Sequence, residues 1–402
     1  MADGPAPDSL WVVNPSGERR AGGWIDDVLA ERVRERGMQA RFPAAASFPR
    51  QRVEVIRAFD TETEVNRLFY ERGWTDGLPI VAPTLARLED MLAGTRLART
   101  SLLGEVDPLR GLATVEKVAV NAVMAGCRPT HLPVVIAAIQ AMLDPAFNMR
   151  GVQTTDENVA PVLIVNGPIA RKLQVNCSFG CLGPGWQANA AIGRAVRLVM
   201  NNIGGGWPSV VSFAGLGQPA RYTLCFAENE AQSPWAPLHV EAGHDAATST
   251  VTVLRAESVV NVTGGLQELA SVIGSAASAF SLLHGGKAVA VVAPATAARL
   301  AADGLDKAAV RRWLWERGRI PTADWERLWL YSNVAKDGRW PEWVLAASES
   351  GAIPAVETPD DIVVVVAGGD VPIAQQAYLP TWGFPACCIT RPIEDNDMDV
   401  DG

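Results

Sequence analysis

Two cysteines, Cys177 and Cys181, lie in a glycine-rich segment that continues through Gly183 and Gly185 to Trp186. Apolar residues recur at helical spacing directly after this segment, so a helix is predicted to begin there. A helix N-terminus attracts negative charge and lowers the pKa of a nearby thiol. The segment therefore predicts a reactive thiolate at Cys181, assisted by Cys177. We expect Gly183, Gly185 and Trp186 to hold an anionic group of a substrate. The alternative is a tight turn whose cysteines fill the core, because free cysteine is among the most buried residue types.

A second group of candidate residues combines carboxylates and imidazoles: Glu228, Glu230, His239, Glu241 and His244. His239 and Glu241 are two residues apart, which places them on one face of a short predicted strand. As acid–base groups, Glu228, Glu230 and His239 would transfer protons during a reaction at the thiol. Alternatively, His239, Glu241 and His244 would bind a divalent transition metal. The remaining interpretation is a solvated, salt-bridged strand edge.

Two further glycines, Gly368 and Gly369, follow an apolar segment that is predicted to be a strand. Ligands of α/β proteins bind at the carboxyl ends of parallel strands, so this pair is expected at the rim of a pocket. The pattern is not the Gly-x-Gly-x-x-Gly of dinucleotide-binding proteins, and a plain turn is the alternative. Lys117 lies on the polar face of a predicted helix. It would bind an acid group of the substrate if buried, and would otherwise be solvated.

The composition of the chain limits its partners and its location. Among 402 residues, Asp and Glu exceed Lys and Arg by 44 to 35, and the resulting net charge of −9 gives no electrostatic reason to bind nucleic acid. No secretory signal is predicted, and no apolar segment approaches the ~20 residues of a membrane-spanning helix. We therefore expect a cytoplasmic protein with a small-molecule substrate and no nucleic-acid or membrane partner. Its six cysteines would be free thiols or metal ligands rather than disulfides.

The elements that must position these residues form an N-terminal arm and two predicted domains. The arm, residues 1–60, contains a candidate helix at 26–36 and aromatic residues expected to contact a neighbouring domain or subunit, and we expect a homo-oligomer. Residues 61–256 are predicted to form an α+β domain with a helical hairpin, helices 114–126 and 130–143, and a mixed sheet. Its strands are expected near residues 161–165, 222–227, 238–241 and 250–254.

Residues 257–402 alternate between strand and helix patterns. The expected elements are strands at 259–262, 288–292 and 362–367 and a helix at 266–282. Such alternation is typical of parallel strands joined by crossover helices. The predicted fold class is therefore α/β, with an N-terminal α+β domain and a C-terminal layered α/β domain whose sheet is mostly parallel.

Several short motifs together resemble a known family. They include Thr75-Asp-Gly-Leu-Pro79, Asn121-Ala-Val-Met-Ala-Gly-Cys-Arg-Pro129, Gly180-Cys-Leu-Gly-Pro-Gly-Trp186, Ala227-Glu-Asn-Glu230 and Leu238-His-Val-Glu241. These motifs look like those of poorly characterised bacterial proteins that carry a UGSC-like domain. The resemblance implies thiol chemistry, and it adds Asn166 and Cys127 to the expected substrate-binding residues. The Cys-Gly-Ser-Cys setting for which that family is named does not occur in this chain.

The sequence as a whole favours an enzyme of specialised small-molecule metabolism, with a lyase, transferase or redox activity that uses a cysteine thiolate on a small anionic substrate. It identifies no cofactor, and a divalent transition metal belongs to the alternative of a metal-dependent lyase or hydrolase. A third function is a non-catalytic subunit of a biosynthetic complex. The thiol mechanism requires Cys181 to share a cavity with Glu228 and His239.

Overall fold

The computed structural model describes residues 9–13, 55–59, 62–333, 340–371 and 373–394. The first two described segments, β1 (Ser9–Val13) and β2 (Val55–Phe59), pair antiparallel. The helix predicted at 26–36 and most of the predicted arm lie outside the described residues. Next along the chain come α2 (Glu62–Glu71), α3 (Leu85–Leu92) and an antiparallel hairpin of β3 (Leu102–Val106) and β4 (Gly111–Thr114).

The first of two larger sheets has the strand order β14-β7-β5-β6. Its strands are β5 (Ala160–Asn166), β6 (Cys225–Ala227), β7 (Thr250–Ala256) and β14 (Ile389–Pro392). β5 runs parallel to β6 and antiparallel to β7, and β14 pairs antiparallel with β7. The sheet is therefore mixed, and its outermost strand β14 comes from the C-terminal part of the chain.

Three helices cover the outer face of this sheet: α4 (Val115–Ala125), α5 (Leu132–Met142) and α8 (Gln187–Asn202). Thr114 caps α4 by accepting a bond from the Lys117 backbone N–H, and Gly126 ends the helix in the left-handed conformation. α4 and α5 pack together as the predicted hairpin, and both contact α8. Three shorter helices lie around this sheet: α6 (Met149–Thr154), α7 (Pro168–Lys172) and α9 (Leu238–Glu241).

The second larger sheet has the strand order β12-β9-β13-β8. Its strands are β8 (Val260–Thr263), β9 (Ala288–Val292), β12 (Ile362–Val366) and β13 (Gln375–Pro380). β12 and β9 are parallel, but β13 is antiparallel to both β9 and β8. The expectation of a mostly parallel sheet is therefore wrong, because β13 returns by a short connection from β12 instead of by a crossover helix.

Helices α10 (Leu266–Ile273) and α13 (Lys307–Arg317) cover the outer face of the second sheet. The helix predicted at 266–282 is interrupted: α10 ends before Gly274, and α11 (Ala279–His284) follows separately. A Cβ at Gly274 would lie 2.6 Å from the backbone of Arg319. The remaining elements are α12 (Pro294–Ala302), β10 (Arg319–Pro321), α14 (Thr322–Trp325), α15 (Trp329–Asn333), α16 (Glu342–Ser348) and β11 (Ala352–Pro354). In the described residues no helix is long and apolar enough to cross a membrane by itself, although two bent helix pairs pass that test jointly.

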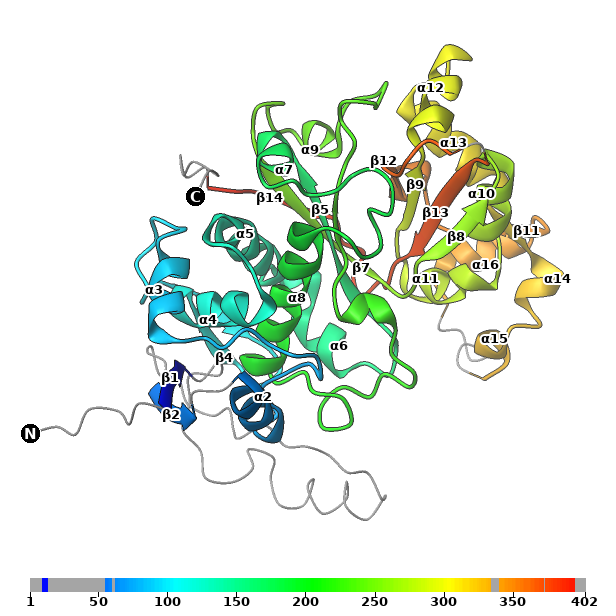
Figure 1. Cartoon of the computed structure of the whole chain (residues 1–402). Helices are drawn as coiled ribbons and strands as arrows, with labels where there is room; N and C mark the ends of the chain where they lie inside the picture. The colour runs from blue at the N-terminus through cyan, green and yellow to red at the C-terminus, as the bar shows by residue number, and fades with distance from the viewer. Residues whose placement is uncertain (1–8, 14–54, 60–61, 334–339, 372, 395–402) are drawn as a thin grey trace, which may run out of the picture.

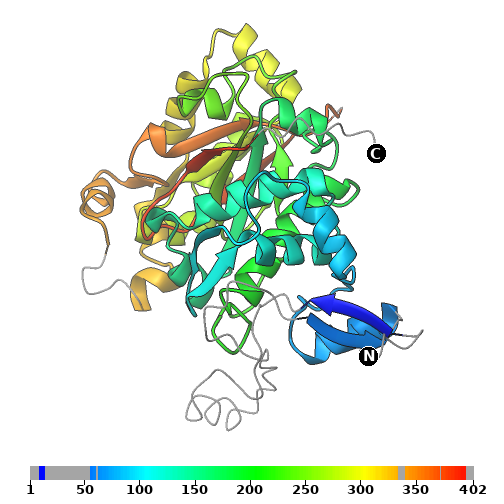
Figure 2. The ribbon, with the colours of Figure 1, turned by 90° about the vertical axis from the view of Figure 1, so that its left-hand side faces the viewer.

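The two larger sheets pack face to face, so the molecule has four layers: helices, sheet, sheet, helices. Figure 1 shows the first sheet with its helices on the left and the second with its helices on the right, and Figure 2 shows the same layers turned by 90°. In β5, Val162 and Ile164 belong to the core between the sheets, whereas Leu163 and Val165 pack against the helices. The predicted boundary after residue 256 falls between β7 and β8, and β14 then crosses back to the first sheet.

Candidate functional site

The thiol loop, residues 173–186, is held against α8 and the second sheet by hydrogen bonds. The Asn176 N–H donates to Asn189 Oδ1 at 2.7 Å, and Asn189 Nδ2 donates to the Asn176 carbonyl at 3.0 Å. The carbonyl of Cys177 accepts a bond from the Gly368 N–H at 2.8 Å. These bonds fix Cys177 between α8 and the end of β12.

Cys177 lines a cavity of about 470 Å³ together with Trp186, Glu228 and Glu230, and we call this cavity the thiol–carboxylate pocket. Its volume lies within the range of ~300–1,000 Å³ typical of small-molecule sites. Loops that are far apart in the chain thus bring together one thiol, two carboxylates and an indole ring. These four residues were among those predicted from the sequence.

Asn166, at the end of β5, holds the two carboxylates in place. Its Nδ2 donates to Glu228 Oε2 at 2.8 Å and to Glu230 Oε1 at 2.9 Å. The same Glu230 oxygen accepts from the Gly167 N–H at 2.7 Å, and Glu228 Oε2 accepts from the Leu238 N–H at 2.7 Å. Asn166 is completely buried and does not line the pocket. It therefore positions the carboxylates, in place of the substrate contact that the resemblance implied.

A buried lysine from the second half of the chain stands behind the carboxylates. Lys307 Nζ lies 2.7 Å from Glu241 Oε2 and 3.6 Å from Glu228 Oε1, and Arg311 binds the other oxygen of Glu241 at 2.7 Å. Burial raises the pKa of Glu228, whereas the charge of Lys307 lowers it. Sequence analysis missed Lys307, because a lysine in the first turn of α13 carries no signal of what packs against it.

The two cysteines of the thiol loop have different surroundings. Cys181 is buried in the apolar core between the sheets, and it lines a separate cavity of about 410 Å³ together with Gly183. Burial raises the pKa of the Cys181 thiol to about 11, and Cys177 adds to this shift. Burial also raises the pKa of Cys177; a backbone amide opposes this shift and Glu230 adds to it.

Two expectations about the thiols are therefore corrected. Cys177, instead of Cys181, shares a cavity with Glu228 and Glu230. Neither thiol has a lowered pKa, because the cost of burying a thiolate exceeds the benefit of the nearby backbone N–H groups.

His239 also occupies an unexpected position. Residues 238–241 form helix α9 rather than a strand, and the His239 side chain is completely buried and absent from the lining of the thiol–carboxylate pocket. Its Nδ1 lies 3.9 Å from Glu230 Oε1, and its Nε2 lies 3.5 Å from the Ala246 carbonyl oxygen. His239 therefore stands behind Glu230 and is out of reach of a substrate in the pocket.

The predicted metal ligands do not form a metal site. The carboxylate of Glu241 is occupied by Lys307 and Arg311, and the imidazole of His239 is buried against Glu230. His244 is partly buried after α9, where its backbone N–H bonds to the His239 carbonyl. Across the described part of the chain, no group of three or more His, Cys, Asp or Glu side chains is arranged to hold a metal ion.

The other predicted substrate-binding residues are scattered. Gly185 is exposed and lines neither cavity, Lys117 is buried within α4, and Cys127 packs against the helices on the first sheet. Gly368 and Gly369 follow β12 and shape the thiol loop: a Cβ on Gly369 would lie 2.3 Å from the ring of Phe179. Gly369 thus allows the thiol loop and the second sheet to approach each other closely.

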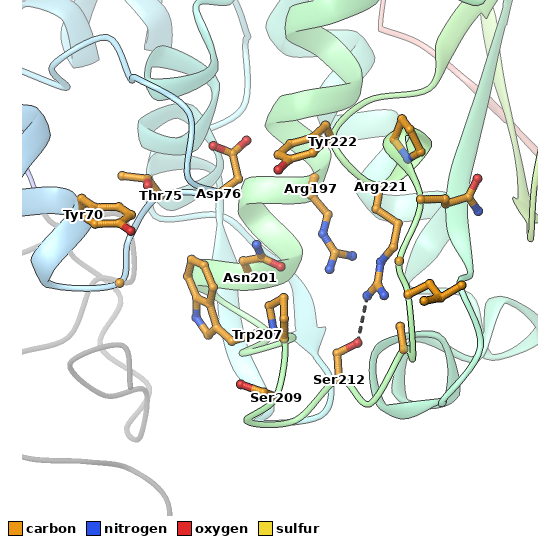
Figure 3. Close-up of a pocket in the computed structure, with 17 residues that line it drawn as sticks. Tyr70, Thr75, Asp76, Arg197, Asn201, Trp207, Ser209, Ser212, Arg221 and Tyr222 are labelled. Atoms are coloured by element: carbon orange, nitrogen blue, oxygen red, sulfur yellow. Dashed lines mark hydrogen bonds between the residues drawn. The ribbon is translucent and has the colours of Figure 1, made fainter. Parts of the chain in front are cut away.

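A larger cavity, of about 650 Å³, lies beside the C-terminal half of α8 and was not predicted. We call it the arginine pocket, because the side chains of Arg197 and Arg221 extend into the same space, as Figure 3 shows. Arg221 Nη2 donates to Ser212 Oγ at 2.9 Å, and Arg197 Nη2 donates to the Gly206 carbonyl at 3.4 Å. One signal in the sequence points here: Arg197 and Asn201 are four residues apart and therefore share a face of the helix.

The charge of the arginine pocket is not balanced by the protein. Among the described residues, no acidic side chain forms an ion pair with Arg197 or Arg221. Asp76 lines the pocket, but both of its oxygens are bound by Arg194 at 2.8 Å. Burial lowers the pKa of Arg197 to about 9, Arg221 adds to this shift and Asp76 opposes it. Arg197 is still protonated at neutral pH, so the pocket is positively charged in a chain whose net charge is −9.

Comparison with protein-family models, with curated proteins and with solved structures gives no match for this chain. The resemblance to proteins with a UGSC-like domain therefore stays a prediction.

Proposed function

We propose that this protein is a cysteine-dependent enzyme that acts on a small molecule in the thiol–carboxylate pocket. Cys177 is the nucleophile and Glu230 is its general base. The observation that carries the proposal is that Cys177 and Glu230 line the same cavity. A thiol and a carboxylate in one cavity are the two groups that covalent catalysis by cysteine requires.

A general base is necessary because the Cys177 thiol is protonated at rest, as its raised pKa requires. The thiolate is the reactive form, so a nearby group must remove the proton when the substrate binds. Glu230 is suited to this role, because its Oε1 is fixed by two N–H donors and its Oε2 has no hydrogen-bond partner among the described residues. The proton moves from sulfur to Glu230 while the sulfur bonds to an electrophilic carbonyl carbon, whose π electrons move to oxygen.

The substrate is expected to be small and to carry a negative charge. Arg171 supplies a cation at the wall of the pocket, and no other described lysine or arginine lines this cavity. The indole of Trp186 is 42% exposed at the same wall and offers an apolar face to the body of the substrate. All six cysteines are free thiols, which supports a reducing location such as the cytoplasm.

The test compares the reactivity of Cys177 with turnover. In the intact protein, iodoacetamide should alkylate Cys177 before Cys181, because Cys181 is more deeply buried; peptide mass spectrometry locates the label. Burial is the main cause of the raised thiol pKa and Glu230 adds to it, so Glu230→Gln should speed alkylation of Cys177 only slightly at pH 8. The same variant should lose turnover of a panel of small carbonyl acids by about 100-fold or more, because the base is gone.

Two controls make the comparison specific. Glu71→Gln removes an exposed carboxylate on α2 and should leave both rates unchanged. Cys177→Ser should abolish turnover, whereas Cys181→Ser should retain most of it. Full activity of Cys177→Ser or of Glu230→Gln, or alkylation of Cys181 before Cys177, would contradict the proposed roles.

A further inference from the structure

We propose that the arginine pocket binds a small organic molecule that carries a dianionic phosphate group. Arg197 and Arg221 hold the phosphate, and the aromatic side chains around them cover the organic part of the ligand. Neither arginine lines the thiol–carboxylate pocket, so this inference stands independently of the proposed function.

The charge of Arg197 has no counterion among the described residues. Arg197 is only 5% exposed, and its guanidinium bonds to the Gly206 carbonyl at 3.4 Å and to the Met200 sulfur at 3.9 Å. Neither partner carries a charge, and the carboxylate of Asp76 is held by Arg194. A buried cation without a counterion is costly, so buried charges in proteins are normally paired. An anion bound between Arg197 and Arg221 supplies the missing negative charge.

The hydrogen-bond donors of the arginine pocket converge. Figure 3 shows both guanidinium groups directed into one space, with the hydroxyl of Ser212 beside Arg221. Guanidinium forks match the oxygens of phosphate and carboxylate groups. A phosphate monoester carries a charge of about −1.5 to −2 at pH 7 and offers three acceptor oxygens, which fits two neighbouring cations. A single carboxylate carries one negative charge and offers two oxygens.

The size and the lining of the cavity suit an organic ligand. Its volume of about 650 Å³ far exceeds that of an inorganic ion. Tyr70, Trp207 and Tyr222 line it, and Leu216, which is 94% exposed, lies on the same lining. Aromatic and aliphatic walls around a small polar group are the usual composition of a pocket for an organic ligand. The ligand is therefore an organic phosphate and not free phosphate.

The two pockets are separate sites on the same helix. Trp186, directly before α8, lines the thiol–carboxylate pocket, whereas Arg197 lines the arginine pocket. At a rise of ~1.5 Å per residue, they lie roughly 16 Å apart along the helix axis. The cavity beside Cys181 adjoins the arginine pocket, since Gln218 and Pro219 line both.

The experiment measures binding of phenyl phosphate to the full chain by isothermal titration calorimetry at pH 7.5. We expect saturable binding with one site per chain, and at least tenfold weaker binding of inorganic phosphate and of benzoate. Arg197→Gln and Arg221→Gln should each weaken binding of phenyl phosphate at least tenfold. The matched control is Arg327→Gln, which removes the same charge from a side chain that is 80% exposed, and it should bind like the unsubstituted protein.

Thermal unfolding shows whether the variants are folded. Without ligand, Arg197→Gln should melt at the same temperature as the unsubstituted protein or higher, because it removes a buried charge that lacks a counterion. If Arg197→Gln fails to fold, the more exposed Arg221→Gln decides the outcome. Absence of phenyl phosphate binding, or unchanged binding in Arg221→Gln, would overturn the site. If benzoate binds as tightly as phenyl phosphate, the ligand group is not specifically a phosphate. If inorganic phosphate binds as tightly as phenyl phosphate, the pocket does not recognise an organic part of the ligand.

Discussion

At the scale of single residues, burial opposes charge at Glu228, Glu257 and Arg197, and it shifts acids and bases in opposite directions. The pKa of Glu228 is raised, although Lys307 opposes the shift, and the pKa of Arg197 is lowered. Burial raises the pKa of Glu257 to about 8 and Glu157 adds to the shift, and among the described residues no cation opposes it. Its Oε1 is buried and lacks a hydrogen-bond partner. Glu257 is therefore the acid whose burial has the clearest consequence for stability.

The effect of Glu257 on stability should depend on pH. Its pKa in the folded protein, about 8, lies above its ordinary value of 4.5, so between these values the folded protein binds the extra proton. The stability that this proton provides is present below pH 4.5 and is lost as the pH rises through 8. Glu257→Gln should therefore raise the free energy of unfolding by about 4 kcal/mol more at pH 8.5 than at pH 4.5. Urea unfolding of both proteins at pH 4.5 and at pH 8.5 measures this difference in the free energy of unfolding.

The control for this prediction is Glu357→Gln, at an exposed position. It should change the free energy of unfolding equally little at both pH values. A stabilisation by Glu257→Gln that is the same at pH 4.5 and pH 8.5 would show that Glu257 keeps its charge in the folded protein.

Sequence reasoning found part of the thiol–carboxylate pocket. Cys177, Glu228 and Glu230 could be named because their residue types carry chemistry and their segments are rich in turn-forming residues. Which of Cys177 and Cys181 faces the cavity could not be predicted, because that depends on how the thiol loop packs on the second sheet. Lys307 and the arginine pair were missed for the same reason: their neighbours belong to distant segments of the chain.

At the scale of elements, predictions succeeded where local signals were strong. Thr114 caps the start of α4 and Gly126 caps its end, as expected, because capping is decided by residues within one turn. The segment at 238–241 was misassigned, since an alternation of four residues is too short to distinguish a strand from a turn of helix. There the Leu238 N–H bonds to the buried Glu228, a tertiary contact that local propensity does not reveal.

The cap of α4 offers a test at this scale. Thr114 is buried, and its hydroxyl oxygen accepts a bond from the Lys117 N–H at 3.4 Å. Thr114→Val keeps the shape of the side chain but removes the cap, so it should lower the free energy of unfolding by about 1 kcal/mol. Thr114→Ser keeps the hydroxyl, so it should lower the free energy of unfolding by less than Thr114→Val does. Chemical unfolding of both variants measures the difference, and a less stable serine variant would mean that packing of the methyl group outweighs the cap.

At the scale of the whole molecule, the two larger sheets depend on each other. Val162, Ile164 and Leu254 of the first sheet share a core with Val363 and Val365 of the second. The α/β class followed from the order of elements in the sequence. The face-to-face packing and the direction of β13 did not, because strand patterns indicate which residues are buried and not what buries them.

This shared core predicts the behaviour of fragments. A fragment of residues 61–256 would expose the inner face of the first sheet and would lack β14. It should therefore bind a hydrophobic dye and melt without a cooperative transition, whereas residues 61–402 should unfold in one cooperative step. Circular dichroism and dye fluorescence of both polypeptides measure this. A cooperative transition in the shorter fragment would show that the first sheet is stable alone.

The return of β14 to the first sheet also affects how the protein is made. While a ribosome is still adding the second half of the chain, the edge of β7 has no neighbour and its backbone N–H and C=O groups are open to other strands. β14 can pair with β7 only after residue 392 has left the exit tunnel. Because the contact joins distant parts of the chain, it forms late and slowly. Nascent chains should therefore need chaperone protection during synthesis, and their yield should fall when that protection is limiting.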